Sequence, residues 1–110
     1  MMRVMDATSE LLDEIVARLT EVSRPARVIV FGSVATGTST AESDVDLLVL
    51  FDDIVDQRLE SIRLRDALGD LGMPVDLVVM STRRFEETKH VIGGIAHPAH
   101  KYGRVIYEAA

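Results

Sequence analysis

Residues 43–51 read SDVDLLVLF, so every position that follows Asp46 is apolar. A strand that is apolar on both faces is typical of the centre of a sheet that is covered on both sides. The two acids in this segment pose a difficulty, because an unpaired buried carboxylate is costly. We therefore expect Asp44 and Asp46 to have a compensating cation, a set of hydrogen-bond donors, or a place at an exposed strand end.

Helices and further strands alternate around this central strand. Apolar residues at helical spacing predict a helix over 9–22, and β-branched runs predict strands over 27–31, 74–80 and 104–107. Helices are also expected over 57–72 and 81–92, with a short helix in the turn at 32–37 and a broken helix before Gly103. The order predicts an α/β (α+β) fold with a small mixed β-sheet flanked by helices.

Length and composition limit the class of protein. The chain has 110 residues, 47% of them hydrophobic, with no linker or repeat, so we expect one domain over 1–110. The net charge of −6 and the aromatic content of 5% argue against direct nucleic-acid binding. There is no cysteine, no apolar run long enough for a membrane span and no signal-peptide pattern. This combination predicts a cytoplasmic protein.

The turn after the strand at 27–31 contains two glycines, in GSVATGTS at 32–39. Its spacing resembles a phosphate-binding loop of ATPases, but Thr38 stands where that loop needs lysine, and an acidic strand follows in place of a long helix. Two interpretations remain. In one, Gly32 and Ser33 contact a phosphate at the start of a short helix. In the other, Gly32 is a turn residue and Ser33 only a helix cap.

The acids share one side of their strand. Asp44 and Asp46 are two residues apart, so they point the same way, about 7 Å apart along the chain. Carboxylates at this spacing repel each other unless a divalent cation sits between them, and Mg²⁺ prefers such ligands. Asp76, at the start of the strand at 74–80, completes a three-carboxylate cluster if the two strands pair. The alternative is a solvated strand start for the pair and a turn-proximal role for Asp76.

Together these residues resemble a known family. The motif Gly32-Ser33 with Ala35 and Gly37, then SDVDLLV at 43–49, then a strand bearing Asp76, is similar to the nucleotidyltransferase superfamily of DNA polymerase beta. The resemblance to its smallest members, the MNT-type minimal nucleotidyltransferases, extends over nearly the whole chain. It implies the polymerase-beta-like nucleotidyltransferase fold.

The resemblance also implies roles for the motif residues. Asp44, Asp46 and Asp76 would bind two Mg²⁺ ions, with Asp76 placed to help deprotonate the acceptor hydroxyl. Gly32, Ser33 and Ser43 would contact the nucleotide, which is ATP or another nucleoside triphosphate. A nucleoside monophosphate, expected to be AMP, would be transferred to the acceptor, and pyrophosphate would leave.

Minimal members of this family typically act with a HEPN-domain protein. They are antitoxins that transfer AMP to a tyrosine of the HEPN toxin, so the resemblance implies a HEPN-type partner and leaves homo- and hetero-oligomers open. One position departs from the pattern, since Thr36 stands where many relatives have a basic residue. Arg83, Arg84 or Lys101 are candidates to replace that cation. The alternative function is a non-catalytic or weakly catalytic antitoxin that neutralises its partner by binding.

Two histidines have a spacing that occurs in metal sites. His97 and His100 stand three apart in HPAH, but Pro98 interrupts the segment and no cysteine or nearby acid completes a zinc shell. We expect these side chains to be surface or partner-contact residues.

Overall fold

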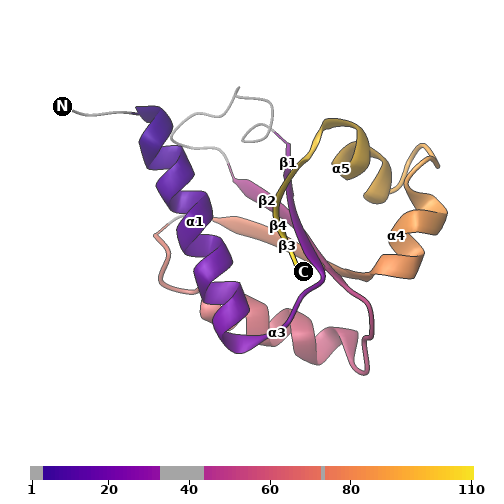
Figure 1. Cartoon of the computed structure of the whole chain (residues 1–110), viewed down its shortest axis with the longest axis horizontal. Coiled ribbons are helices and arrows are strands. Elements are labelled where there is room, and N and C mark those ends of the chain that lie inside the picture. The colour runs from indigo at the N-terminus through magenta and orange to yellow at the C-terminus, as the bar shows by residue number, and fades with distance from the viewer. Residues whose placement is uncertain (1–3, 33–43, 73) are drawn as a thin grey trace.

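The chain folds into a four-stranded sheet with helices on both faces. The computed structural model describes residues 4–32, 44–72 and 74–110. Figure 1 shows the elements in chain order: α1 (Val4–Val22), β1 (Arg27–Phe31), β2 (Val45–Phe51), α3 (Gln57–Ala67), β3 (Val75–Ser81), α4 (Thr82–Thr88), α5 (Ala96–Tyr102) and β4 (Arg104–Glu108). None of the helices in the described ranges is long and apolar enough to cross a membrane.

The sheet is mixed, as the sequence predicted. Its strand order is β3-β2-β1-β4, in which β1 pairs antiparallel with β2 and with β4, and β2 pairs parallel with β3. The parallel pair needs a crossover connection, and α3 provides it. The α/β (α+β) fold class is therefore confirmed, with β2 as a central strand.

Each face of the sheet has its own core. On one face, Val45, Leu47 and Val49 of β2 pack against residues of α1 and α3. On the other face, Leu48 and Leu50 pack against residues of α4 and α5. Figure 1 shows these helix pairs on opposite sides of the sheet. Because successive strand residues alternate between the faces, the continuous apolar run of β2 fills both cores.

The structure corrects several predicted boundaries. Helix α1 begins at Val4, five residues before the predicted start, and α3 ends at Ala67, where a turn replaces the last five predicted residues. Helix α4 is also short: the predicted segment 81–92 contains Thr82–Thr88, capped by the Ser81 hydroxyl, which accepts from the Arg84 amide at 3.0 Å. The strand 27–31 and the turn at Gly103 are confirmed. The predicted short helix at 32–37 falls almost entirely outside the described residues.

Strand β3 lies at one edge of the sheet, and side chains of α3 cover that edge. Arg65 donates from its guanidinium to the carbonyl oxygen of Leu77 at 3.0 Å, and Gln57 donates from its amide nitrogen to that of Val79 at 2.6 Å. In a parallel pair, alternate residues of the edge strand direct their backbone groups away from the neighbouring strand. The two side chains therefore satisfy carbonyls that would otherwise be open to another chain.

The opposite edge strand, β4, is irregular. Val28 of β1 pairs with Tyr107, whereas the next residue, Ile29, pairs with Val105, so Ile106 is an extra residue in β4. This β-bulge places both Ile106 and Tyr107 against the core beneath α1 and α3. A bulge bends an edge strand and disfavours pairing with a further strand.

Candidate active site

Asp46 and Asp76 lie side by side on neighbouring strands. They are register partners in the parallel β2–β3 pair, whose backbones are about 4.8 Å apart. Asp46 alternates with Leu47 and shares the face of Leu48, so both acids point to the α4–α5 side of the sheet. On the other side of Asp46, its register partner in β1 is Phe31. The residues Phe31, Asp46 and Asp76 thus form one row across three strands.

Asp44 directly precedes β2 and acts electrostatically on the same site. Burial raises the pKa of the Asp46 carboxyl, and the negative charges of Asp76 and Asp44 raise it further. Asp44 and Asp76 are exposed, whereas Asp46 is partly buried. The three predicted carboxylates are therefore brought close enough together for each of the outer two to disfavour the charge on the central one.

Gly32 lies against the carboxylate of Asp46. Its φ is +75°, in the left-handed region that favours glycine. A Cβ atom built on Gly32 would overlap Oδ2 of Asp46 and lie 3.3 Å from its Cγ. Glycine at this position therefore serves two purposes, because it permits the turn after β1 and leaves room for the acid. The sequence singled out Gly32 as a phosphate contact but gave no sign of its contact with Asp46.

The donor set suits a hard divalent cation. All three groups are carboxylates, the ligand type that Mg²⁺ prefers, and a cation between them would remove the repulsion that raises the pKa of Asp46. As they stand, no three acidic, histidine or cysteine side chains within residues 4–32, 44–72 and 74–110 are arranged to hold a metal ion. The described acids therefore fit a metal by ligand chemistry and by their place in the sheet, and their side chains would have to move to ligate one.

Some of the predicted site lies elsewhere or outside the described residues. Ser33, Thr36 and Ser43 fall outside them. Arg83 and Arg84 follow the far end of β3, about 16 Å along the strand from Asp76, and Arg83 pairs with Glu87 at 3.3 Å. Neither arginine therefore replaces the missing cation at the acids. Lys101 lies in the last turn of α5, and its ammonium is 5.4 Å from the ring centre of Tyr102.

The histidines of the tail do not form the pair that their spacing suggested. The His100 ring meets the edge of His90 at a centroid distance of 5.1 Å and lies 6.2 Å from Phe85. Pro98 is the third residue of α5, within the first turn, where a missing N–H costs no helical hydrogen bond. His100 therefore packs on the α4 side of the helix.

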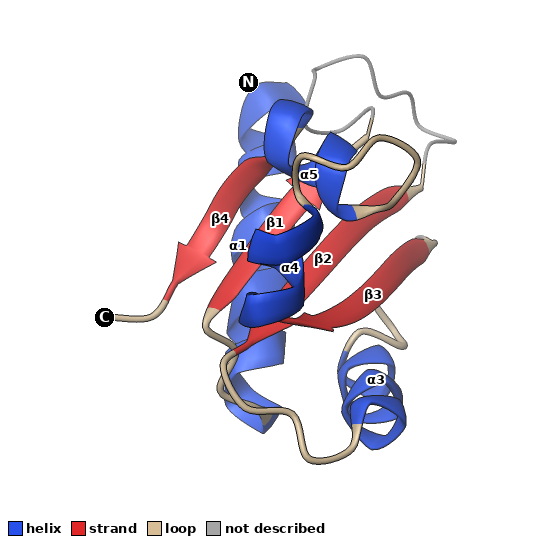
Figure 2. Ribbon diagram, turned by 90° about the vertical axis from the view of Figure 1, so that its right-hand side faces the viewer, coloured by secondary structure: helices blue, strands red, loops and turns tan. Residues whose placement is uncertain are grey.

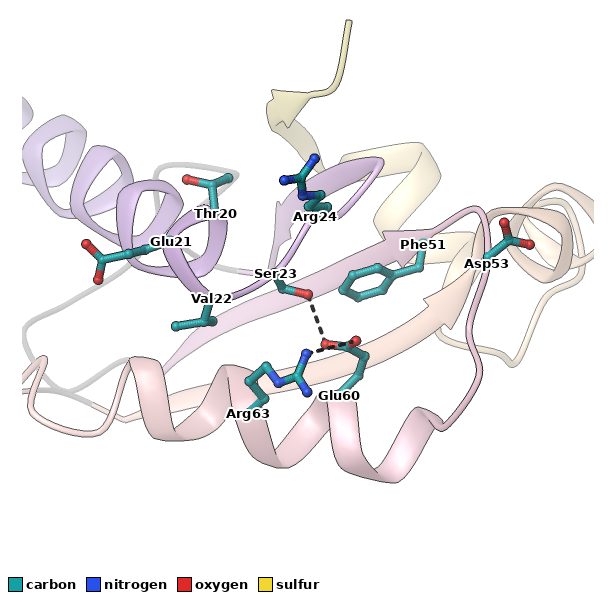
Figure 3. A pocket seen from close by; sticks show the side chains of 9 residues that line it. All are labelled: Thr20, Glu21, Val22, Ser23, Arg24, Phe51, Asp53, Glu60 and Arg63. Carbon is teal, nitrogen blue, oxygen red and sulfur yellow. Dashed lines mark hydrogen bonds and ion pairs between the residues drawn. The ribbon is translucent and has the colours of Figure 1, made fainter.

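A cavity of about 460 Å³ lies at the opposite end of the sheet, next to Phe51 (Figure 3). In it, the Ser23 hydroxyl donates to Glu60 at 2.9 Å, and Arg63 pairs with the other oxygen of Glu60 at 3.7 Å. Phe51 is the last residue of β2, about 16 Å along the strand from Asp46. This cavity is therefore separate from the acidic row.

The sequence and the fold were compared with known proteins. A family model described as a nucleotidyltransferase domain matches residues 10–98. No curated protein gives a significant match. Among solved structures, a toxin–antitoxin with AMP-PNP is 22% identical, with a TM-score of 0.64, covering 89% of this chain and 73% of that chain.

Two further structures share the fold. A putative nucleotidyltransferase from Sulfolobus solfataricus is 16% identical, with a TM-score of 0.63, covering 94% of this chain and 86% of that one. A tri-AMPylated HEPN toxin in complex with MNT antitoxin, from Shewanella oneidensis, is 19% identical, with a TM-score of 0.59, covering 93% and 73%. At these identities the likeness establishes the fold.

Proposed function

The chain belongs to the family of nucleotidyltransferase domains, as its motif predicted, and on that premise we propose that it transfers AMP from ATP to a hydroxyl group of a protein partner. The observation that carries the proposal is the row formed by Asp46 and Asp76 beside Gly32, with Asp44 acting on it. A transferase of this class needs carboxylates that hold divalent cations close to the triphosphate.

In the proposed reaction Asp44, Asp46 and Asp76 would hold two Mg²⁺ ions. When bound, these cations neutralise charge on the triphosphate and favour attack at the α-phosphorus. The acceptor oxygen forms a bond to that phosphorus, the bond to the pyrophosphate oxygen breaks, and Asp76 accepts the hydroxyl proton. Asp76 suits this role because it is the exposed member of the row. The turn at Gly32, with Ser33 and Ser43, contacts the phosphates.

The proposed acceptor is a tyrosine of a HEPN-domain protein. Structures that share this fold include an AMPylated HEPN toxin with its MNT antitoxin and a toxin–antitoxin with AMP-PNP. These descriptions apply to those proteins. We extend the HEPN-type acceptor to this chain because it shares their fold and its acidic row contains the carboxylates that AMP transfer needs. The cytoplasmic location, the single domain over 1–110 and the absence of nucleic-acid binding stay predictions.

The test is transfer of label from ATP radiolabelled at the α-phosphate to a co-expressed HEPN-domain protein, in the presence of Mg²⁺. The wild type should label it, and Asp46→Asn should not. Asp53→Asn is the matched control, because Asp53 is an exposed aspartate beyond the other end of β2. Equal labelling by Asp46→Asn and wild type would show that the acidic row is not catalytic.

A second candidate is a non-catalytic or weakly catalytic antitoxin that neutralises the same partner by binding. The observation that favours it is that Thr36 stands in the basic position and that two of the three candidate replacements, Arg83 and Arg84, lie at the far end of β3. Growth rescue separates the two functions. If the Asp44→Asn variant rescues cells from the HEPN protein as fully as the wild type does, the chain neutralises its partner by binding.

A further inference from the structure

The loop between α4 and α5 carries three exposed apolar side chains. Val91 is 55% exposed, Ile92 84% and Ile95 41%, and we refer to these three residues as the loop patch. Single exposed apolar residues are ordinary on protein surfaces, but three within five positions of one short loop are a concentrated apolar surface.

The loop patch lies on the face of the sheet to which Asp46 and Asp76 point. Helix α4 starts at the far end of β3 and, in Figure 2, runs back along the sheet, so the loop that follows it lies at the end where β2 begins. The α4–α5 face is also the face to which Asp46 and Asp76 point. A macromolecule whose side chain enters the acidic row from that face therefore comes near this loop.

The segment that carries the loop patch is positively charged in an acidic protein. Residues 82–104 contain five basic and two acidic residues, a formal +3, whereas the remaining seven basic and sixteen acidic residues give −9. Lys101 and Arg104, which follow the loop patch at the end of α5 and the start of β4, are exposed and make no ion pair with any described residue. All three histidines also lie in this segment. An apolar contact bordered by cations fits a partner surface with apolar side chains bordered by carboxylates.

We infer that the loop patch is the docking surface for the acceptor protein of the transfer reaction. Val91, Ile92 and Ile95 enter an apolar depression of that protein, and the surrounding cations face its carboxylates. The inference rests on the proposed function for the identity of the partner, the HEPN-domain protein, and adds the surface that binds it. A few well-buried apolar side chains can carry most of the binding energy of such an interface.

The experiment separates docking from chemistry. Binding to the HEPN-domain protein used in the transfer assay is measured by calorimetry with Ile92→Ser and Ile95→Ser, each in the Asp46→Asn background, which removes the proposed transfer. The matched controls are Val55→Ser and Ile62→Ser, because Val55 is 102% and Ile62 48% exposed, on or beside α3. Helix α3 covers the opposite face of the sheet. Circular dichroism confirms that each variant is folded.

We expect Ile92→Ser to raise Kd by about tenfold or more, since burial of such a side chain is worth more than 1.4 kcal/mol at a central contact. The controls should stay within about twofold of the parent, and added salt should weaken binding. Equal Kd values for Ile92→Ser and Ile62→Ser would overturn the inference. So would a complex that forms only between copies of this chain through the loop patch. If the wild type fails to label the partner while the Kd values of the variants follow the expected pattern, only the proposed reaction is overturned.

Discussion

Asp76 sits directly beside Asp46 on a parallel neighbour strand, and neither acid has an ion-pair partner among the described residues. Two like charges in register destabilise a sheet unless something binds between them. The pair is therefore costly to the folded chain unless a cation binds between the two carboxylates. Four predictions follow from this relationship and from the contacts around it.

Mg²⁺ should stabilise the wild type against heat and should not stabilise Asp76→Asn. Binding to the folded state alone contributes about 2.7 kcal/mol when the ion is at a hundred times its Kd. The measurement is a thermal-unfolding scan with Mg²⁺ or with EDTA. Asp53→Asn, at the other end of β2, should respond to Mg²⁺ like the wild type. An equal response of Asp76→Asn and Asp53→Asn would count against a metal site at Asp76.

In EDTA, Asp46→Asn should be more stable than the wild type at pH 7. Burial, and then the charges of Asp76 and Asp44, raise the pKa of Asp46, so its charged form destabilises the folded chain. This penalty is absent below the unfolded-state pKa, grows as the pH rises through the folded-state pKa, and is constant above it. We expect a gap on the order of 0.5 kcal/mol at pH 7, as for a like-charged pair on neighbouring strands. Urea unfolding from pH 3 to pH 8 should show the gap closing at low pH, and a gap that widens there would contradict the assignment.

Gly32→Ala should impair the site beyond its effect on stability. Alanine at a positive φ costs about 1 kcal/mol or more, and here its Cβ would also displace the Asp46 carboxylate. Gly72→Ala is the matched control, because its φ is +92° and nothing lies within 4 Å of an added Cβ. Both variants should lose similar free energy of unfolding, but only Gly32→Ala should lose transfer, by about 100-fold. Similar transfer rates for Gly32→Ala and Gly72→Ala would show that the contact between Gly32 and Asp46 does not contribute to the reaction.

Removing the side chains that cover β3 should destabilise the chain and promote self-association. Arg65→Ala and Gln57→Ala each free a carbonyl of the edge strand, a loss of about 1 kcal/mol in the free energy of unfolding. Arg58→Ala, on the same helix and without a hydrogen bond or ion pair to a described residue, should change the free energy of unfolding by less than about 0.5 kcal/mol. Urea unfolding and analytical ultracentrifugation at several protein concentrations are the measurements. If Arg58→Ala self-associates as readily as Arg65→Ala, the loss of surface charge, and not the freed carbonyl, is the cause of the association.

The fold class followed from the sequence because the strongest signals are local. The run at 47–51 is apolar at every position, and such a pattern has few solutions other than a covered central strand. The helix ends were predicted less well. Leu68 and Leu71 extend the apolar pattern of α3, yet both pack against the core from a turn after the helix has ended at Ala67. A leucine buried from a helix and a leucine buried from the turn that follows it give the same sequence pattern.

The sequence indicated the residues of the candidate site and not the contacts among them. Alternation placed Asp44 and Asp46 on one side of a strand, but the approach of Asp76 depends on the β2–β3 register, which no local pattern encodes. The same holds for the contact between Gly32 and Asp46, which results from the antiparallel pairing of β1 with β2. Arg83 and Arg84 were misplaced as substitutes for the cation missing at Thr36, because sequence distance gave no measure of the length of β3 that separates them from Asp76.

The covered edge of β3 has a consequence for the kind of substrate that reaches Asp76. Arg65 and Gln57 occupy the outward carbonyls of Leu77 and Val79. An extended peptide therefore cannot pair as an added strand with the part of β3 that follows Asp76. A polypeptide acceptor therefore has to reach Asp76 without adding a strand to β3, from the face of the sheet to which Asp46 and Asp76 point.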